Sequence, residues 1–141
     1  QALVFYCEEN NIPSEKLSQS DMLEISKRAA FHLSIFVAWL AKHDFLNPQS
    51  DGFNLEDVQK LKNETITGTD YLFKHLDKKL YSTDISDILR PFISDFYEDF
   101  MDFYYTVLVD DVARTEFDWK IYHLVEDDIN EIFSQYKTHI G

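Results

Sequence analysis

The chain has 141 residues, enough for one domain with a substantial buried core. Its aromatic content of 16% argues against intrinsic disorder, and its 3 glycines and 3 prolines are too few for the many turns of a β-sandwich or an α/β fold. The 26 acidic and 13 basic residues give a net charge of −13, which excludes nucleic acids and anionic membranes as partners. With a single cysteine and no apolar run of the roughly 20 residues that a membrane span needs, the chain is expected to be cytoplasmic.

The first 20 residues leave two alternatives open. The short apolar run from Ala2 to Cys7 is compatible with a helix or with a buried strand. Pro13, followed by Ser14 and Glu15, favours a helical turn. Cys7 is interpreted as a small buried hydrophobic residue.

A strong amphipathic helix is predicted from about Asp21 to His43. Phe31, Ile35 and Trp39 add apolar groups outside its main stripe, so we expect this helix to lie at the centre of the fold. The stripe, expected to be buried, consists of Ala29, Leu33, Phe36, Val37 and Leu40. His32 is interpreted as a buried, hydrogen-bonded histidine, with a ligand or switch role as the alternative.

Two shorter helices are predicted next. Asn54 is a suitable N-cap for a helix that directs Leu55, Val58 and Leu61 toward the core. The pattern breaks at residues 65–69, and a further helix follows. Its apolar residues are Tyr71, Leu72, Leu76 and Leu80.

The longest periodic stretch lies between Leu89 and Val107, with Phe92, Phe96 and Phe103 on one face and Phe100 at its edge. Proline is favoured at the first position of a helix, so this helix is expected to begin at Pro91. A final helix is predicted from about Val125 to Tyr136. The sequence thus predicts an all-α bundle of about five to seven helices, with residues 1–141 forming one domain.

Acidic residues are concentrated in the second half of the chain. Residues 86–136 contain 13 acidic and three basic residues, whereas the remainder contains 13 acidic and ten basic ones. Solubility alone gives no reason for this segregation, so we expect an acidic surface that binds a basic protein, with a solvated helix face as the alternative. The candidate partner-binding residues are Asp95, Glu98, Asp99, Asp102, Asp110, Asp111, Glu126, Asp127 and Asp128.

Sequence patterns for catalysis or metal binding are absent. No histidine has a glutamate three residues before it, as a di-iron bundle requires, and one cysteine without a His-x-x-x-His pair does not make a zinc site. The alternating oxygens of a calcium loop and the glycines of a phosphate loop are also missing. We therefore expect neither an enzyme nor a metal or cofactor site.

Several segments, in the right order, resemble a group of small bacterial helical proteins. Residues 32–40 (HLSIFVAWL) are similar to the opening motif of that group, in which a histidine precedes an aliphatic–Phe–x–Ala–Trp helix. Residues 66–73 (ITGTDYLF) resemble its turn into a helix, and they are followed by residues 77–80 (DKKL) and 95–100 (DFYEDF). Residues 119–136 resemble its closing helix.

Members of this group often look like immunity proteins of contact-dependent growth inhibition and related toxin systems. The resemblance therefore implies an immunity protein that covers the active site of a basic toxin domain, such as a nuclease, and it implies no catalytic residues. The alternative is a cytoplasmic regulatory or adaptor module without a toxin partner.

Overall fold

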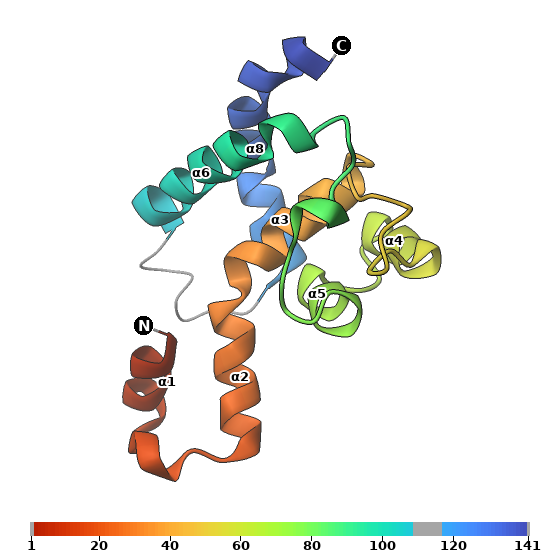
Figure 1. Cartoon of the computed structure of the whole chain (residues 1–141). Helices are drawn as coiled ribbons and strands as arrows, with labels where there is room; N and C mark the ends of the chain where they lie inside the picture. Colours follow the sequence, from red (N-terminus) through yellow and green to blue (C-terminus); the bar gives the residue numbers. More distant parts are fainter. Residues whose placement is uncertain (1, 109–116, 141) are drawn as a thin grey trace.

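The computed structural model describes residues 2–108 and 117–140, and this part of the chain contains seven α-helices and no strand. With 71% of the chain helical, the predicted all-α bundle is confirmed (Figure 1). Short 3-10 turns occur at Ser14–Lys16, Ser82–Asp84 and Arg90–Phe92, and a π-helix follows at Tyr104–Leu108. The α-helices are α1 (Ala2–Asn10), α2 (Gln19–Ala29), α3 (Phe31–Lys42), α4 (Leu55–Lys62), α5 (Gly68–His75), α6 (Ile93–Phe103) and α8 (Trp119–Ile140).

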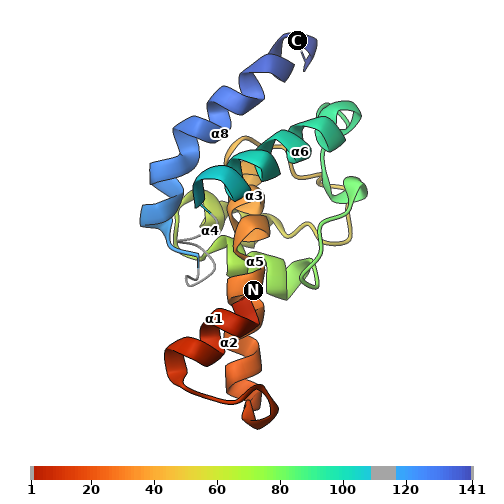
Figure 2. The same cartoon turned by 90° about the vertical axis from the view of Figure 1, so that its left-hand side faces the viewer.

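Helix α3 lies in the middle of the bundle, with α4 and α5 on one side and α6 and α8 on the other (Figures 1 and 2). All residues from Ser34 to Ala41 are buried, because neighbouring helices cover α3 nearly all round. An α-helix that is apolar on all sides requires such cover. The predicted central position of this segment is confirmed.

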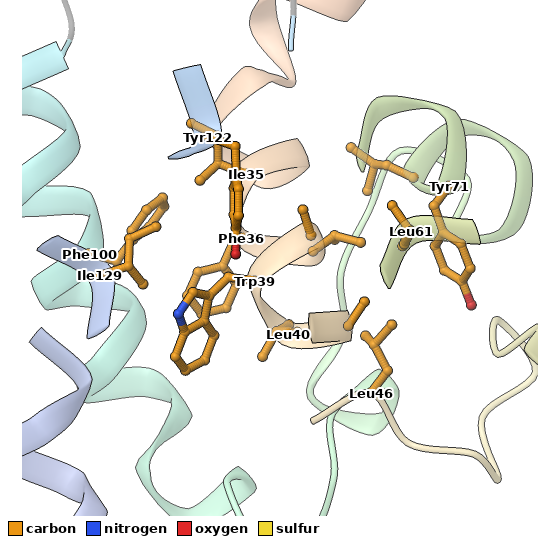
Figure 3. Packing of buried hydrophobic residues seen from close by; sticks show 14 of the residues in the cluster. Ile35, Phe36, Trp39, Leu40, Leu46, Leu61, Tyr71, Phe100, Tyr122 and Ile129 are labelled. Atoms are coloured by element: carbon orange, nitrogen blue, oxygen red, sulfur yellow. The ribbon is translucent and has the colours of Figure 1, made fainter. Parts of the chain in front are cut away.

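The side of α3 toward α6 and α8 is packed with aromatic rings (Figure 3). The ring of Phe36 lies 5.4 Å from that of Phe96 and 5.1 Å from that of Phe100, measured between centroids. Trp39 packs edge-on against Phe133 of α8 at 5.1 Å, and its indole nitrogen donates a hydrogen bond of 2.9 Å to Asn130 Oδ1. These contacts place α6 and α8 against the same face of α3.

The side of α3 toward α5 depends on a close backbone approach. A Cβ atom added to Gly68 would lie only 2.0 Å from the carbonyl oxygen of Ser34, so only glycine fits at this crossing. The Thr69 hydroxyl donates to Ser34 Oγ over 2.8 Å, and Ser34 Oγ donates to the Ala30 carbonyl. The first turn of α5 therefore packs directly on the backbone of α3.

The single helix predicted over residues 21–43 is wrong, because the chain turns at Ala30 and forms α2 and α3. Ala30 has φ −90° and ψ 7°, and its carbonyl accepts the first backbone hydrogen bond of α3, from Ser34. The break allows α2 to pair with α1 while α3 enters the core (Figure 1). No glycine or proline marks this position, so the sequence contains no local signal for it.

The break changes the burial of the predicted stripe. Phe36, Val37 and Leu40 are fully buried as predicted, whereas Leu33 is half-buried. Ala29 is exposed because it ends α2, which lies outside the core.

The predicted cap of α4 is confirmed, because the Asn54 side chain accepts a 2.9 Å hydrogen bond from the Asp57 amide. Val58 and Leu61 are buried as predicted. Leu55 is 62% exposed, and the prediction for it is wrong: it occupies the first turn, on the outer side of the helix.

Helices α6 and α8 differ from their predicted starts. Pro91 lies in a 3-10 turn, and α6 begins two residues later at Ile93. Phe100 is fully buried rather than at the edge of the apolar face. Helix α8 begins at Trp119, six residues before the predicted start, and the Trp119 indole donates to the Ile66 carbonyl over 2.9 Å.

Helices α1 and α2 form an arm that extends from the bundle (Figures 1 and 2). The open alternatives for residues 2–7 are resolved in favour of helix, and Pro13 precedes the predicted turn. Tyr6 donates a hydrogen bond to Asp21, and Arg28 pairs with Glu9 at 2.9 Å. Cys7 of α1, which was predicted to be buried, is half-buried. In the described part of the chain, none of the helices is long and apolar enough to cross a membrane.

Candidate partner-binding surface on helices α6 and α8

Four of the predicted acidic residues lie on α6. Because successive helical residues turn by about 100°, Asp95 and Asp102 share one side of the helix with Asp99, and Glu98 lies slightly further round. Asp95, Glu98 and Asp102 are exposed, whereas Asp99 is half-buried. The buried rings of Phe96 and Phe100 contact Phe36 of α3 instead, and Figure 3 shows Phe100 on the side toward α3.

Asp99 joins α6 to α8. Its carboxylate accepts a hydrogen bond of 2.6 Å from Gln135 Nε2 and a second bond from the Tyr136 hydroxyl. Burial, the bond to Asp99 and the charges of Asp95 and Glu98 raise the pKa of Tyr136 to about 12. Asp99 is therefore a contact between the two helices, and only its neighbours on α6 are free to meet a partner.

The acidic residues of α8 are divided between two sides of the helix. By the same rotation, Asp128 and Glu131 share the side of Gln135, so they adjoin the acidic side of α6 at the Asp99 contact. Glu126 lies on roughly the opposite side, with its carboxylate 3.8 Å from His123 Nδ1. Asp127 is exposed between the two sides.

The structure therefore brings together part of the predicted site and extends it. Glu131 belongs to this surface although it was not among the predicted residues. Leu124, one turn before Asp128, is 74% exposed on the same side of α8. The sequence prediction missed it because the apolar pattern placed the start of α8 at Val125, one residue after Leu124. Asp110 and Asp111 lie outside the described residues.

We define the acidic α6–α8 surface by its exposed residues, Asp95, Glu98, Asp102, Asp128 and Glu131, with Leu124 beside them. Within the described ranges, none of these five carboxylates forms an ion pair. The segment from Pro91 to Ala113 contains no lysine, arginine or histidine that could neutralise them. The charge of this surface is therefore available to an external partner.

Two other acidic residues, Asp57 and Glu64, have ionic partners within the fold, and the spacing of residues in the sequence does not indicate these pairs. The buried Asp57 of α4 accepts from His75 Nε2 at 2.6 Å and from Lys74 Nζ at 3.1 Å, both at the end of α5. These hydrogen bonds, first from His75 and then from Lys74, lower the pKa of Asp57. Because the partners are 17 and 18 residues away in the chain, only the packing of α4 on α5 brings them together.

A second paired carboxylate links α8 to α3. Glu64 accepts hydrogen bonds from Lys42 Nζ at 2.7 Å and from His123 Nε2 at 2.8 Å, and both bonds lower its pKa, that from Lys42 the more. The Lys42 ammonium lies 5.1 Å from the ring centre of Trp119. This cluster fixes the start of α8 against the end of α3.

The histidines of these pairs do not form a nucleophilic site in the described part of the chain, where neither His75 nor His123 is hydrogen-bonded to a serine, threonine or cysteine. The described residues also contain no cluster of three side chains suited to a metal ion. His32 is half-buried, its ring packs edge-on against Tyr104 at 5.4 Å, and burial lowers its pKa.

Residues 9–136 match the family described as Domain of unknown function (DUF7832). The chain belongs to this family. The match includes α2 to α6 and α8 as far as Tyr136, and it omits most of α1. Comparison with curated proteins and with solved structures gave no match.

Proposed function

We propose that the chain is a cytoplasmic immunity protein, which binds a basic toxin domain through the acidic α6–α8 surface and so covers the active site of that domain. The observation that supports this proposal is the set of unpaired, exposed carboxylates on this surface, which contrasts with the paired carboxylates of Asp57 and Glu64. The resemblance of residues 32–40 and 66–73 to helical immunity proteins suggests the class of partner.

The charge of this surface suits rapid capture. Opposite potentials steer two proteins together and raise association rates from about 10⁵–10⁶ toward 10⁸–10⁹ M⁻¹s⁻¹ at low salt. Toxins that cleave nucleic acids have basic active-site clefts, and carboxylates spaced along a helix can replace phosphates there. Fast association matters when a single delivered toxin molecule can kill the cell.

Affinity requires an apolar anchor as well as charge, because exposed charges chiefly affect the association rate. Leu124 provides such a group at the edge of the acidic surface, with 74% of its area exposed. Under the proposal, Leu124 enters an apolar pocket of the toxin while Asp128 and Glu131, on the same side of α8, contact its basic rim.

The test is a search of the genes beside this one for a toxin domain, followed by co-expression of the two proteins; neighbouring genes that encode no toxin domain would count against the proposal. We expect protection of the cell, co-elution in gel filtration, and an association rate that falls with added salt. Replacing Asp95 and Asp102 by lysine should slow association at least tenfold at low salt. The matched control replaces Glu8 and Asp51 by lysine, which changes the net charge equally at exposed sites elsewhere.

Equal association rates for the two double variants would contradict the placement of the binding surface. A neighbouring toxin domain that neither binds nor is neutralised would contradict the immunity function itself.

The alternative function is that of a regulatory or adaptor module, which the α1–α2 arm favours. This arm exposes Leu3, Val4, Met22 and Leu23, each at least 40% accessible, beyond the main core. An adaptor that docks through the arm should lose its partner when Val4 and Met22 are replaced by serine. An immunity protein that binds through α6 and α8 should still neutralise its toxin.

A further inference from the structure

An apolar groove lies beside the side of α6 that carries Ile93 and Tyr97, opposite Asp95 and Asp102. It has a volume of about 510 Å³ and is formed by α3, the start of α6 and the segment that links α5 to α6. Its apolar lining includes Leu33, Phe36, Leu80, Ile85, Ile93 and Tyr97. This volume lies within the range of roughly 300–1,000 Å³ of small-molecule sites, which are mostly apolar with a few placed polar groups.

The charged groups of this groove are both positive. Lys78 and Lys79 line it, and no carboxylate does so among the described residues. The chain reaches this position through a turn in which Asp77 and Lys78 have φ of 52° and 65°. Neither ammonium is paired with a described carboxylate, although Lys78 Nζ also lies 5.1 Å from the ring centre of Phe73. In a protein with a net charge of −13, this is a place where an anion is attracted rather than repelled.

Tyr97 adds a hydrogen-bond donor to the wall of the groove. Its ring packs edge-on against Phe36 at 5.1 Å, which fixes its position. Burial raises the pKa of Tyr97 to about 12, so the hydroxyl stays protonated at neutral pH. Within residues 2–108 and 117–140 this hydroxyl has no hydrogen-bond partner.

We propose that this groove binds an amphiphilic monoanion, with an apolar chain or ring against Leu33, Leu80 and Ile93 and a carboxylate at Lys78 and Lys79. The Tyr97 hydroxyl donates a hydrogen bond to the ligand. The site is separate from the acidic α6–α8 surface, so the proposal does not depend on the immunity function.

Isothermal titration of the intact chain at neutral pH and low salt tests the proposal. The probes are decanoate, decanol and decyltrimethylammonium, which share a chain length and differ in charge. We expect decanoate to bind most tightly, because only it combines the apolar chain with a charge that the lysines attract. Equal or tighter binding of decanol or of the cation would overturn the proposal.

Three variants locate the site. Replacing Lys78 and Lys79 by glutamine should weaken decanoate binding about tenfold, whereas the same change at Lys120 and Lys137, exposed on α8, should leave it unchanged. Ser94 lines the groove and is exposed, so Ser94→Phe should fill the groove and abolish binding without unfolding the chain.

Circular dichroism and the melting temperature report whether each variant is folded. A folded Ser94→Phe variant that still binds decanoate would place the ligand elsewhere and overturn the proposal. Equal losses for the two lysine pairs would show that net charge, rather than the groove, governs binding, and would also overturn it.

Discussion

The acidic residues on the two sides of α3 differ in burial and in ion pairing. On the α4–α5 side, Asp57 is buried and bonded to His75 and Lys74. On the α6–α8 side, carboxylates such as Asp95 and Asp102 are exposed and have no ionic partner in the described part of the chain. On this side, aromatic rings make the contact with α3.

The charge of Asp57 stabilises the fold, whereas the charges of Asp95 and Asp102 are exposed and accessible to a binding partner. A buried carboxylate is stable only when charged and hydrogen-bonded groups surround it, so its partners come from within the chain. Exposed like charges on one helix side repel each other slightly and contribute no stability. Their concentration on α6 and α8 is the feature that the proposed basic partner would account for.

Removing an aromatic ring from the α6–α8 side should have the largest effect on stability. Phe36→Ala deletes a fully buried ring that contacts Phe96 and Phe100, and it should lower the free energy of unfolding by about 3–5 kcal/mol through lost burial and a cavity. Urea denaturation measures the change. The control, Tyr105→Ala, truncates a 60% exposed ring and should cost less than about 0.5 kcal/mol. A Phe36→Ala loss as small as the control would refute the proposed packing.

Adding one methyl group on the opposite side should be almost as costly. In Gly68→Ala, the new Cβ would lie 2.0 Å from the Ser34 carbonyl oxygen, so α5 must move away from α3 at a cost of about 3 kcal/mol. In Gly52→Ala, the nearest atom is the end of the flexible Leu76 side chain, and the loss should be smaller. Thermal unfolding compares the two variants, and we expect the lower melting temperature for Gly68→Ala. Equal melting temperatures would contradict the close helix crossing.

Neutralising the buried carboxylate of Asp57 should lower the free energy of unfolding by about 1–3 kcal/mol at pH 7, because Asp57→Asn weakens the bonds to His75 and Lys74. The pKa of Asp57 is lowered in the folded chain, so its charge stabilises the fold above a pH of about 4. This contribution disappears as the pH falls through the lowered pKa. Urea denaturation between pH 7 and pH 3 should therefore show that the unfolding free energies of the wild type and of Asp57→Asn approach each other as the pH falls.

Asp128→Asn is the control for this titration, because Asp128 is exposed and unpaired among the described residues. It should follow the wild-type curve throughout. A difference between wild type and Asp57→Asn that stays constant down to pH 3 would argue against a charge-dependent role for Asp57.

The smallest changes in stability are expected on the acidic α6–α8 surface, whereas Asp99, which joins the two helices beside it, should matter more. Asp99→Asn should cost about 1 kcal/mol, because Asp99 accepts bonds from Gln135 and Tyr136 of α8. Replacing Asp95 and Asp102 together by lysine should change stability by no more than about 0.5 kcal/mol. Thermal unfolding separates the two cases. A larger loss in the lysine variant would show that these acids have a structural role after all.

Much of the candidate site followed from helical periodicity. The apolar spacing of Phe92, Phe96 and Phe103 predicted α6 and, with it, the grouping of Asp95 and Asp102 on one side. The contact of Asp99 with α8 and the division between Glu126 and Asp128 could not be predicted. Both depend on how α8 is rotated about its axis against α6, and a pattern within one helix does not specify that rotation.

The sequence by itself determined the helical class, the cap at Asn54 and the central position of the segment around Phe36, since each depends on residues only a few positions apart. Only the tertiary structure decided the turn at Ala30, the pairing of Asp57 with His75 and the groove beside Tyr97. The physical reason is that these features form where distant helices meet. There, packing overrides even the strong helix preference of an alanine and creates partners that sequence spacing does not indicate.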